Sequence, residues 1–170
     1  MNVISGHKKP LLLAHRGTAL LAPESTVPAF DFAMSHGTDV FEIDVRLSRD
    51  NQVMVFHDAT LERTTNGNGL VRAMDAASLK QLDAAFNFTL DNQWPQRGTG
   101  VQIITLTELL ERYPGIRVNI DIKDADEDAV RAVGRIVERH DAADRCVLAS
   151  FHNQQAVSYT HLTLPTTPYV

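Results

Sequence analysis

Apolar and polar residues alternate strictly from Val40 to Leu47, which predicts a β-strand with one apolar face and one polar face. The same alternation returns from Val118 to Lys123, and three shorter apolar runs are bounded by turn residues or polar loops. The predicted strands therefore lie at residues 11–14, 40–47, 53–58, 118–123 and 145–149.

Helix-start signals and apolar residues at helical spacing lie between most of these strands. A capping box at Thr105 and Glu108 starts one such helix. Strands that alternate with helices form βα units in a largely parallel sheet. The connection from Leu47 to Val53 is too short for a crossover helix, so a tight link replaces one parallel connection there. Residues 86–100 have no clear period and predict a loop. The predicted helices lie at residues 26–36, 75–85, 105–113 and 126–140.

The composition, 170 residues with 44% hydrophobic and 22% charged, is typical of a soluble globular domain. A formal charge of −5 argues against nucleic acid and anionic membranes as partners, because both are recognised through basic surfaces. No apolar run is long enough for a signal peptide or a membrane span, so we expect a cytoplasmic protein without stable membrane insertion. The single cysteine, Cys146, excludes an internal disulfide and lies in a predicted buried strand.

Polar residues suited to catalysis stand at the ends of four predicted strands. In parallel βα architectures, catalytic groups gather at the carboxyl ends of strands, where loops leave the sheet. Two imidazoles, three carboxylates and two cations at such positions are hard to explain by packing alone. The candidates are His15, Arg16, Glu42, Asp44, His57, Asp121 and Lys123.

Glu42 and Asp44 share one strand face, where two acids repel each other unless water or a cation screens them. A solvated face explains this pair alone, but parallel strands are usually covered on both faces. With Asp121 from another strand, the three carboxylates form the oxygen-rich set that Mg²⁺ or Ca²⁺ prefers. Zinc with histidine ligands is the rival interpretation, and three carboxylates suit it less well.

His15 and His57 are candidates for an acid and base pair, because imidazole titrates near neutral pH. A lone histidine at a strand end is more often structural, whereas two beside a carboxylate cluster favour catalysis. Arg16 and Lys123 are candidates for neutralising a bound phosphodiester. Either cation is also compatible with an ordinary ion pair to a carboxylate of the cluster.

Six short motifs follow one another between about residues 11 and 152: His15-Arg16-Gly17, Pro23-Glu24-Ser25-Thr26, Glu42-Ile43-Asp44-Val45, His57-Asp58, Leu61-Glu62-Arg63-Thr64-Thr65 and Asn119-Ile120-Asp121-Ile122-Lys123. In sequence, order and spacing they resemble the glycerophosphodiester phosphodiesterase family. The resemblance implies an α/β fold of the TIM-barrel type and the activity of a phosphoric diester hydrolase.

The resemblance also implies a role for each candidate residue. It implies a Mg²⁺ or Ca²⁺ ion held by Glu42, Asp44 and Asp121, general acid/base catalysis by His15 and His57, and phosphate contacts from Arg16 and Lys123. Two residues depart from the family pattern. Ser25 stands where the family usually has Asn, which we expect to change a local hydrogen bond. Asp121 stands where the third metal carboxylate is usually Glu, and its shorter side chain is expected to weaken or re-space the site.

A closed (β/α)₈ barrel needs about 200 to 250 residues, and this chain shows about five strands. We therefore expect an incomplete barrel in residues 1–155, which folds poorly alone or closes its exposed edge through another chain as an oligomer. Residues 156–170 contain no Asp, Glu, Lys or Arg and break the pattern. Three interpretations of this atypical tail are a disordered terminus, an ordered arm and, in best agreement with the barrel, an interrupted reading frame.

Together these features favour metal-dependent hydrolysis of a small-molecule glycerophosphodiester to an alcohol and glycerol 3-phosphate. One histidine would activate the nucleophile and the other would protonate the leaving oxygen. Lysophospholipase D activity on the same scaffold is an alternative, because the apolar loop from Phe86 to Trp94 could receive an acyl chain. A catalytically silent protein that binds a cation or phosphate is the third hypothesis.

Overall fold

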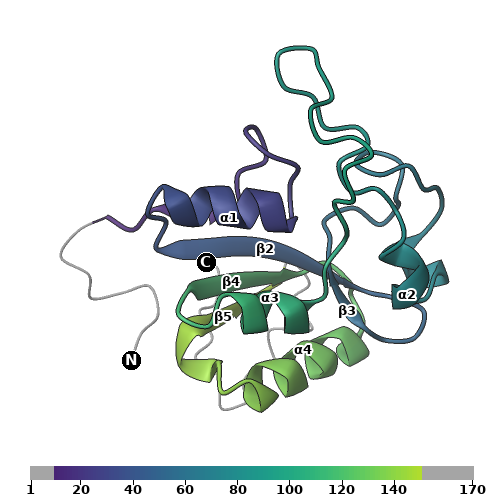
Figure 1. Ribbon diagram of the computed structural model, residues 1–170. Coiled ribbons are helices and arrows are strands. Elements are labelled where there is room, and N and C mark those ends of the chain that lie inside the picture. The colour runs from purple at the N-terminus through teal and green to yellow at the C-terminus, as the bar shows by residue number, and fades with distance from the viewer. Residues whose placement is uncertain (1–9, 151–170) are drawn as a thin grey trace.

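The computed structural model describes residues 10–150, which fold around one five-stranded sheet (Figure 1). Four strands run parallel in the order β1-β2-β4-β5, and β3 runs antiparallel beside the C-terminal end of β2. This arrangement confirms the predicted parallel sheet and the tight link after β2. Within the described residues the sheet is open rather than closed into a barrel. The strands are β1 (Leu13–His15), β2 (Val40–Leu47), β3 (Val53–Val55), β4 (Arg117–Ile122) and β5 (Cys146–Ala149).

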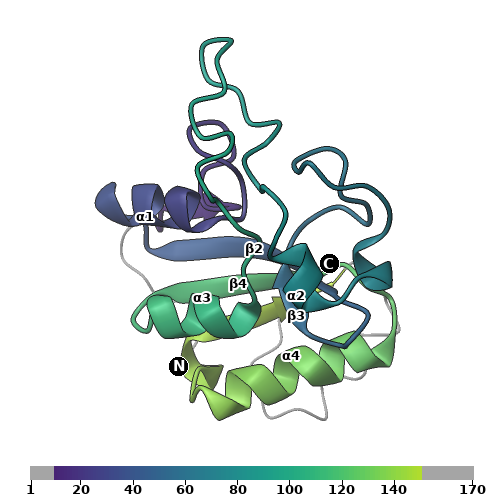
Figure 2. The ribbon, with the colours of Figure 1, turned by 45° about the vertical axis from the view of Figure 1, so that its right-hand side comes forward.

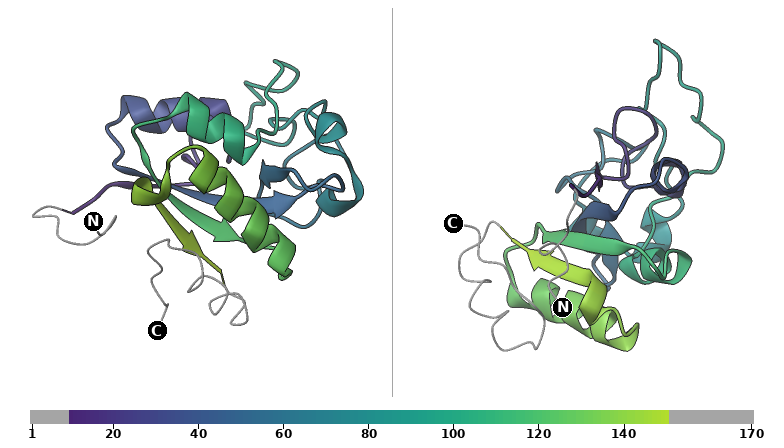
Figure 3. Two further views of the ribbon diagram at one scale, coloured as in Figure 1. Left: turned by 90° about the horizontal axis from the view of Figure 1, so that it is seen from below. Right: turned by 90° about the vertical axis from the view of Figure 1, so that its left-hand side faces the viewer.

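Three helices lie along one side of the sheet, as the right-hand view of Figure 3 shows. Their positions confirm three of the predicted helices to within one or two residues. These helices are α1 (Val27–Ser35), α3 (Leu106–Arg112) and α4 (Glu127–Arg139). Shorter helical segments are η1 (Val71–Ala73), α2 (Ala76–Leu79) and η2 (Ala143–Arg145).

The core lies between the apolar face of the sheet and these helices. Phe41 of β2 is fully buried, and its ring centroid lies 4.8 Å from that of Phe30 on α1 and 5.2 Å from that of Tyr113 after α3. Cys146 is buried in β5 as predicted, and burial raises the pKa of its thiol to about 11. The alternating pattern of β2 and β4 therefore directs one side chain of every two into this core.

Local hydrogen bonds fix where the longer helices begin. The predicted capping box is present: the backbone N–H of Glu108 donates to Oγ1 of Thr105 (3.2 Å), and the N–H of Thr105 donates to the Glu108 carboxylate (2.9 Å). Asp126 caps α4 by accepting from the N–H of Ala129 at 2.9 Å. Each cap satisfies a backbone donor that the first helical turn leaves unpaired.

The predicted helix from residue 75 to 85 is wrong in length, because α2 ends at Leu79. Beyond it, Asp83 makes hydrogen bonds that a helix does not allow. Its N–H donates to Oδ1 of Asn66 (2.8 Å), and its carboxylate accepts from the N–H groups of Ala85 (2.9 Å) and Gly98 (2.7 Å). Side-chain hydrogen bonds of this kind compete with helix formation.

Residues 86–100 form the predicted loop, which projects from the body in Figures 1 and 2. In the part of the chain that the structure describes, no helix combines the length and apolarity needed to cross a bilayer. The predicted boundary at residue 155 and the atypical tail at residues 156–170 lie outside the described residues.

Candidate active site

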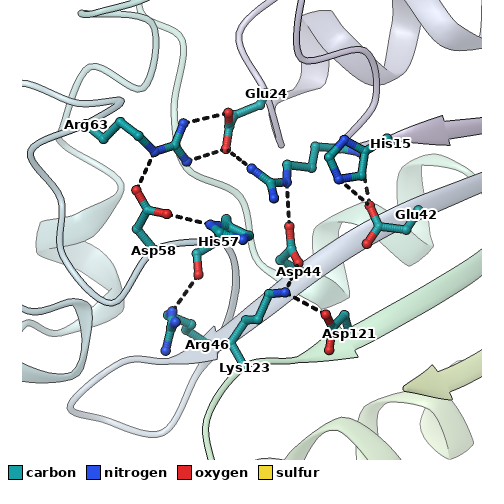
Figure 4. A network of polar contacts seen from close by, with 11 residues as sticks. His15, Glu24, Glu42, Asp44, Arg46, His57, Asp58, Arg63, Asp121 and Lys123 are labelled. Carbon is teal, nitrogen blue, oxygen red and sulfur yellow. Dashed lines mark hydrogen bonds and ion pairs between the residues drawn. The ribbon is translucent and has the colours of Figure 1, made fainter. Parts of the chain in front are cut away.

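The register of three parallel strands brings the polar strand ends together. Pairing of β1 with β2 places His15 beside Glu42, and pairing of β2 with β4 places Asp44 beside Asp121. Side chains on the same face of paired strands are neighbours. Figure 4 shows that the candidate residues from these strands converge in one region.

Glu42, Asp44 and Asp121 form a compact carboxylate cluster. One oxygen from each lies within 4.8 Å of the others, and the three side chains are only 14%, 1% and 9% exposed. Burial, together with the negative charge of Asp44, raises the pKa of Glu42 above its ordinary value. The cluster therefore carries an electrostatic cost that a bound cation would relieve.

Two cationic side chains reach into the carboxylate cluster. Nζ of Lys123 lies 2.8 Å from Oδ1 of Asp44 and 2.6 Å from Oδ2 of Asp121. Burial acts to lower the pKa of Lys123, but the two carboxylates outweigh it and hold the pKa above its usual value. Nε of Arg16 lies 2.9 Å from Oδ2 of Asp44. Both cations thus form ion pairs with carboxylates. The sequence had allowed this arrangement as an alternative to phosphate binding.

Buried oxygens in this region indicate that the cluster suits a hard cation. Oδ2 of Asp44, Oδ1 of Asp121 and Oδ1 of the neighbouring Asn119 accept no hydrogen bond from the described residues. Arg16 approaches Asp44 closely, yet its Nε–H is not aligned for a hydrogen bond. Carboxylate and amide oxygens are the ligands that hard divalent cations prefer. The residues present therefore fit such an ion, with Glu42, Asp44 and Asp121 as the groups that would hold it.

The loop after β1 needs a glycine to reach this geometry. Gly17 has a φ of +82°, and a Cβ atom there would lie 2.8 Å from Cβ of Ala29. The turn places the backbone N–H of Arg16 2.9 Å from the carbonyl oxygen of Glu42, so the loop starts by continuing the pairing of β1 with β2. Arg16 itself adopts a φ of 51°. The motif at residues 15–17 is thus a turn that aims the Arg16 side chain at the carboxylate cluster.

The two histidines approach the carboxylate cluster from different elements, His15 from the end of β1 and His57 from the loop after β3. The imidazole of His15 is 61% exposed, and its Nε2 lies 3.8 Å from Oε2 of Glu42. His57 follows β3, and its Nδ1 lies 2.5 Å from Oδ1 of Asp58. In the view of Figure 4 the two imidazoles lie on opposite sides of Asp44. The structure therefore brings both histidines to the region where the sequence placed them, with His15 much the more exposed.

Residues to which sequence reasoning gave no role join the His57 loop to the carboxylate cluster. Glu24, Asp58 and Arg63 form ion pairs that run from His57 to Arg16 (Figure 4). Arg46 makes a second connection, between β2 and the His57 loop: its Nε donates to the carbonyl oxygen of His57 at 2.8 Å. Three of these residues lie inside the recognised motifs, so the motifs were the only available signal.

This chain is similar to known proteins along most of its length. The model of the "Glycerophosphoryl diester phosphodiesterase family" matches residues 15–167. A glycerophosphodiester phosphodiesterase of Caldanaerobacter subterraneus is 34% identical over 154 residues, which are 85% of this chain and 59% of that protein. The lysophospholipase D GDPD1 of Rattus norvegicus is 32% identical over 128 residues, which are 75% of this chain and 41% of that protein.

A solved structure also matches the fold. The Oleispira antarctica phosphodiesterase, solved with the product sn-glycerol-3-phosphate, superposes with a TM-score of 0.79 at 32% identity. The match covers 93% of this chain and 64% of that one, so the chain spans less than two thirds of the length of these relatives. The described residues therefore form an unclosed, partial α/β barrel of the TIM type, as predicted.

Proposed function

This chain belongs to the glycerophosphoryl diester phosphodiesterase family, and we propose that it hydrolyses small-molecule glycerophosphodiesters to an alcohol and glycerol 3-phosphate. The observation that carries the proposal is the carboxylate cluster with Arg16 and Lys123, which lies between His15 and His57 in Figure 4. Phosphodiester hydrolysis needs positive charge around the phosphate, a proton acceptor for the nucleophile and a proton donor for the leaving oxygen. This arrangement contains a group for each task.

The carboxylate cluster is proposed to bind Mg²⁺ or Ca²⁺ through Glu42, Asp44 and Asp121. A divalent cation held there would supply positive charge that offsets the negative charge developing on the phosphate. Arg16 keeps one end of its guanidinium, Nη2, without a partner among the described residues, and this end is available for a phosphate oxygen. Lys123 adds a second positive charge at the same place.

Proton transfer is assigned to the imidazoles. A carboxylate only accepts hydrogen bonds, so Nδ1 of His57 carries the proton in its contact with Asp58, and Nε2 is left to exchange a proton with substrate. His15 presents an exposed ring beside Glu42. One imidazole removes the proton from the nucleophile, and the other gives a proton to the leaving oxygen.

The decisive experiment changes each histidine separately. His15→Ala and His57→Ala should each lower kcat about 10²- to 10⁴-fold, the usual contribution of general acid–base catalysis. Calorimetry should find metal affinity unchanged in both. His36→Ala, which removes an exposed histidine at the end of α1, is the matched control. Retention of activity in both site variants would refute the acid/base assignment.

The metal proposal has its own test. Glu42→Ala and Asp44→Ala should abolish binding of Mg²⁺ and Ca²⁺, whereas Glu111→Ala on the exposed side of α3 should not. If the wild-type chain binds these ions but hydrolyses no glycerophosphodiester, the chain is the catalytically silent cation-binding protein. If it binds neither ion, the metal proposal fails.

Lysophospholipase D activity is the second candidate, supported by the rat relative and the projecting loop. Leu90 and Trp94 in this loop are 40% and 50% exposed, although the Trp94 ring also covers the guanidinium of Arg97 at 4.6 Å. Rates on glycerophosphocholine and lysophosphatidylcholine discriminate between the two activities. Faster turnover of lysophosphatidylcholine that Trp94→Ala selectively removes would favour the lipid substrate.

The open edge of the sheet is proposed to pair with a second copy of the chain. Near β1, Leu13, Leu20 and Leu21 are 45%, 85% and 54% exposed and border an apolar hollow of about 460 Å³. Light scattering should detect a dimer that Leu20→Lys disrupts. A monomer with a cooperative unfolding transition would contradict this idea.

We propose a cytoplasmic location, which microscopy of the tagged chain would test.

A further inference from the structure

Arg63 connects the loop that follows His15 to the loop that carries His57. It belongs to the loop after β3, and its guanidinium holds Glu24, which belongs to the loop after β1, through two parallel contacts. Nη1 donates to Oε2 at 2.8 Å and Nη2 donates to Oε1 at 2.7 Å. Nε donates to Oδ2 of Asp58 at 2.5 Å. One side chain thus contacts a carboxylate on each loop (Figure 4).

The contact with Asp58 acts on His57. Asp58 uses one oxygen for Nδ1 of His57 and the other for Nε of Arg63, so its carboxylate is held at both ends. Burial acts to raise the pKa of Asp58, but the hydrogen bonds from Arg63 and His57 outweigh it and keep the pKa below its usual value. A fixed, ionised Asp58 selects the imidazole tautomer with the proton on Nδ1.

The contact with Glu24 acts on Arg16. Oε1 of Glu24 accepts from Nη1 of Arg16 at 3.2 Å as well as from Arg63, and the Glu24 side chain is only 14% exposed. Without Arg63, this carboxylate would have Arg16 as its only cationic partner among the described residues. The Arg16 guanidinium, whose Nε now lies 2.9 Å from Oδ2 of Asp44, would then be drawn toward Glu24 and away from Asp44.

We propose that Arg63 is a positioning residue, which sets the tautomer and orientation of His57 through Asp58 and the direction of Arg16 through Glu24. The inference rests on the proposed function for its kinetic consequence, but its structural consequence is independent of turnover. Arg63 touches neither the phosphate-binding end of Arg16 nor Nε2 of His57. Its loss should therefore affect catalysis through other residues.

The test uses the full chain with Arg63→Gln and Arg63→Lys, and Arg112→Gln as the matched control. Arg112 also pairs with an aspartate, Asp31, at 2.9 Å, but on the helix side of the sheet. Arg63→Gln should lower kcat about 10- to 100-fold, the usual size for supporting residues, with a smaller change in KM. Arg63→Lys should restore only part of kcat, because an ammonium group cannot span both carboxylates. Arg112→Gln should leave kcat unchanged.

A second measurement needs no activity: ¹⁵N NMR of the imidazole reports which ring nitrogen carries the proton. His57 should show the Nδ1–H tautomer in the wild-type chain and in Arg112→Gln, and a mixture in Arg63→Gln. An inactive wild-type chain with this NMR result defeats the proposed function but supports the positioning role. A pure Nδ1–H tautomer in Arg63→Gln overturns the positioning role whatever the activity. If Arg63→Gln does not fold, the same NMR criterion applies to Arg63→Lys.

Discussion

The two faces of β2 differ in how well the folded chain provides their side chains with favourable contacts. On the face toward the helices, four alternate residues are at most 1% exposed and contact other apolar side chains: Phe41, Ile43, Val45 and Leu47. On the opposite face, Asp44 is as deeply buried but lies among charged side chains of both signs and keeps an oxygen without a hydrogen bond. One face of β2 therefore stabilises the fold, whereas the other carries a buried carboxylate whose hydrogen-bonding capacity is only partly satisfied. Such a division is expected where a site is built for a ligand.

The largest effect should come from the apolar face. Phe41→Ala removes a fully buried ring that packs on Phe30 and Tyr113, so we expect a loss of about 3–5 kcal/mol in the free energy of unfolding. Denaturant unfolding measures this loss. Phe32→Ala on α1, whose ring is only partly buried against His36, should cost clearly less. Equal losses would mean that the apolar face does not dominate stability.

The next effect concerns the cation on the polar face. Lys123→Met removes the ammonium between Asp44 and Asp121, and without metal it should cost up to about 3 kcal/mol, the lower end for breaking a buried ion pair. Mg²⁺ or Ca²⁺ should recover much of this loss, because a bound cation replaces the missing charge. Thermal unfolding with EDTA and with each ion measures both values.

The control for this substitution is Lys80→Met, which breaks a more exposed ion pair with Glu108. Its cost should stay below about 1 kcal/mol and should not depend on metal. If added metal leaves the Lys123→Met deficit unchanged, the carboxylate cluster does not bind a cation in the proposed way.

The sequence predicted the two faces of β2 because alternation is a local property of the chain. It also predicted that Asp121 would join Glu42 and Asp44, since parallel strands carry their ends to the same edge. It could not predict the partners of Arg63, because these depend on how the loops after β1 and β3 approach each other. It also left the role of Lys123 undecided, because a position directly after β4 suits an ion pair with the carboxylates as well as contact with a phosphate.

Local pattern also failed where distant groups compete for the backbone. Residues 80–85 have helical composition, but Asn66 and Gly98 take up the hydrogen-bonding groups of Asp83, and α2 ends early. The same kind of long-range contact fixes the loop after β1. There a glycine at residue 17 is needed because α1 passes close by, which no local pattern shows.

A smaller effect should come from Gly17→Ala, which tests whether this loop geometry supports the polar face. The new Cβ would lie 2.8 Å from Cβ of Ala29, whereas Gly37, also at positive φ, has nothing within 4 Å. Both changes strain the backbone, so their difference isolates the steric contact. Gly17→Ala should cost about 1–3 kcal/mol more than Gly37→Ala. It should also lower kcat, because Arg16 lies in this loop and His15 directly precedes it. Equal behaviour of the two variants would argue against this role.

The smallest effect on stability should be a gain rather than a loss. It concerns Glu42, which follows Phe41 and points to the polar face of β2. Because burial and Asp44 raise the pKa of Glu42 in the folded chain, the folded state binds the proton more tightly than the unfolded state. The stability from this proton is present at low pH and is lost as pH rises from the ordinary value of 4.5 through the raised pKa. Glu42→Gln removes the ionisable group, so without metal it should raise the melting temperature at neutral pH, and this gain should vanish in acid.

Metal should make the wild-type chain more stable than the Glu42→Gln variant, the reverse of the order expected without metal. Mg²⁺ or Ca²⁺ should stabilise the wild-type chain by binding only its folded state, and should stabilise Glu42→Gln much less. Melting curves at two pH values, with EDTA and with each ion, measure both changes, and Glu111→Gln on the exposed side of α3 should follow the wild type throughout. A Glu42→Gln variant that is less stable than the wild type in EDTA at neutral pH would show that the polar face contributes to the fold as the apolar face does.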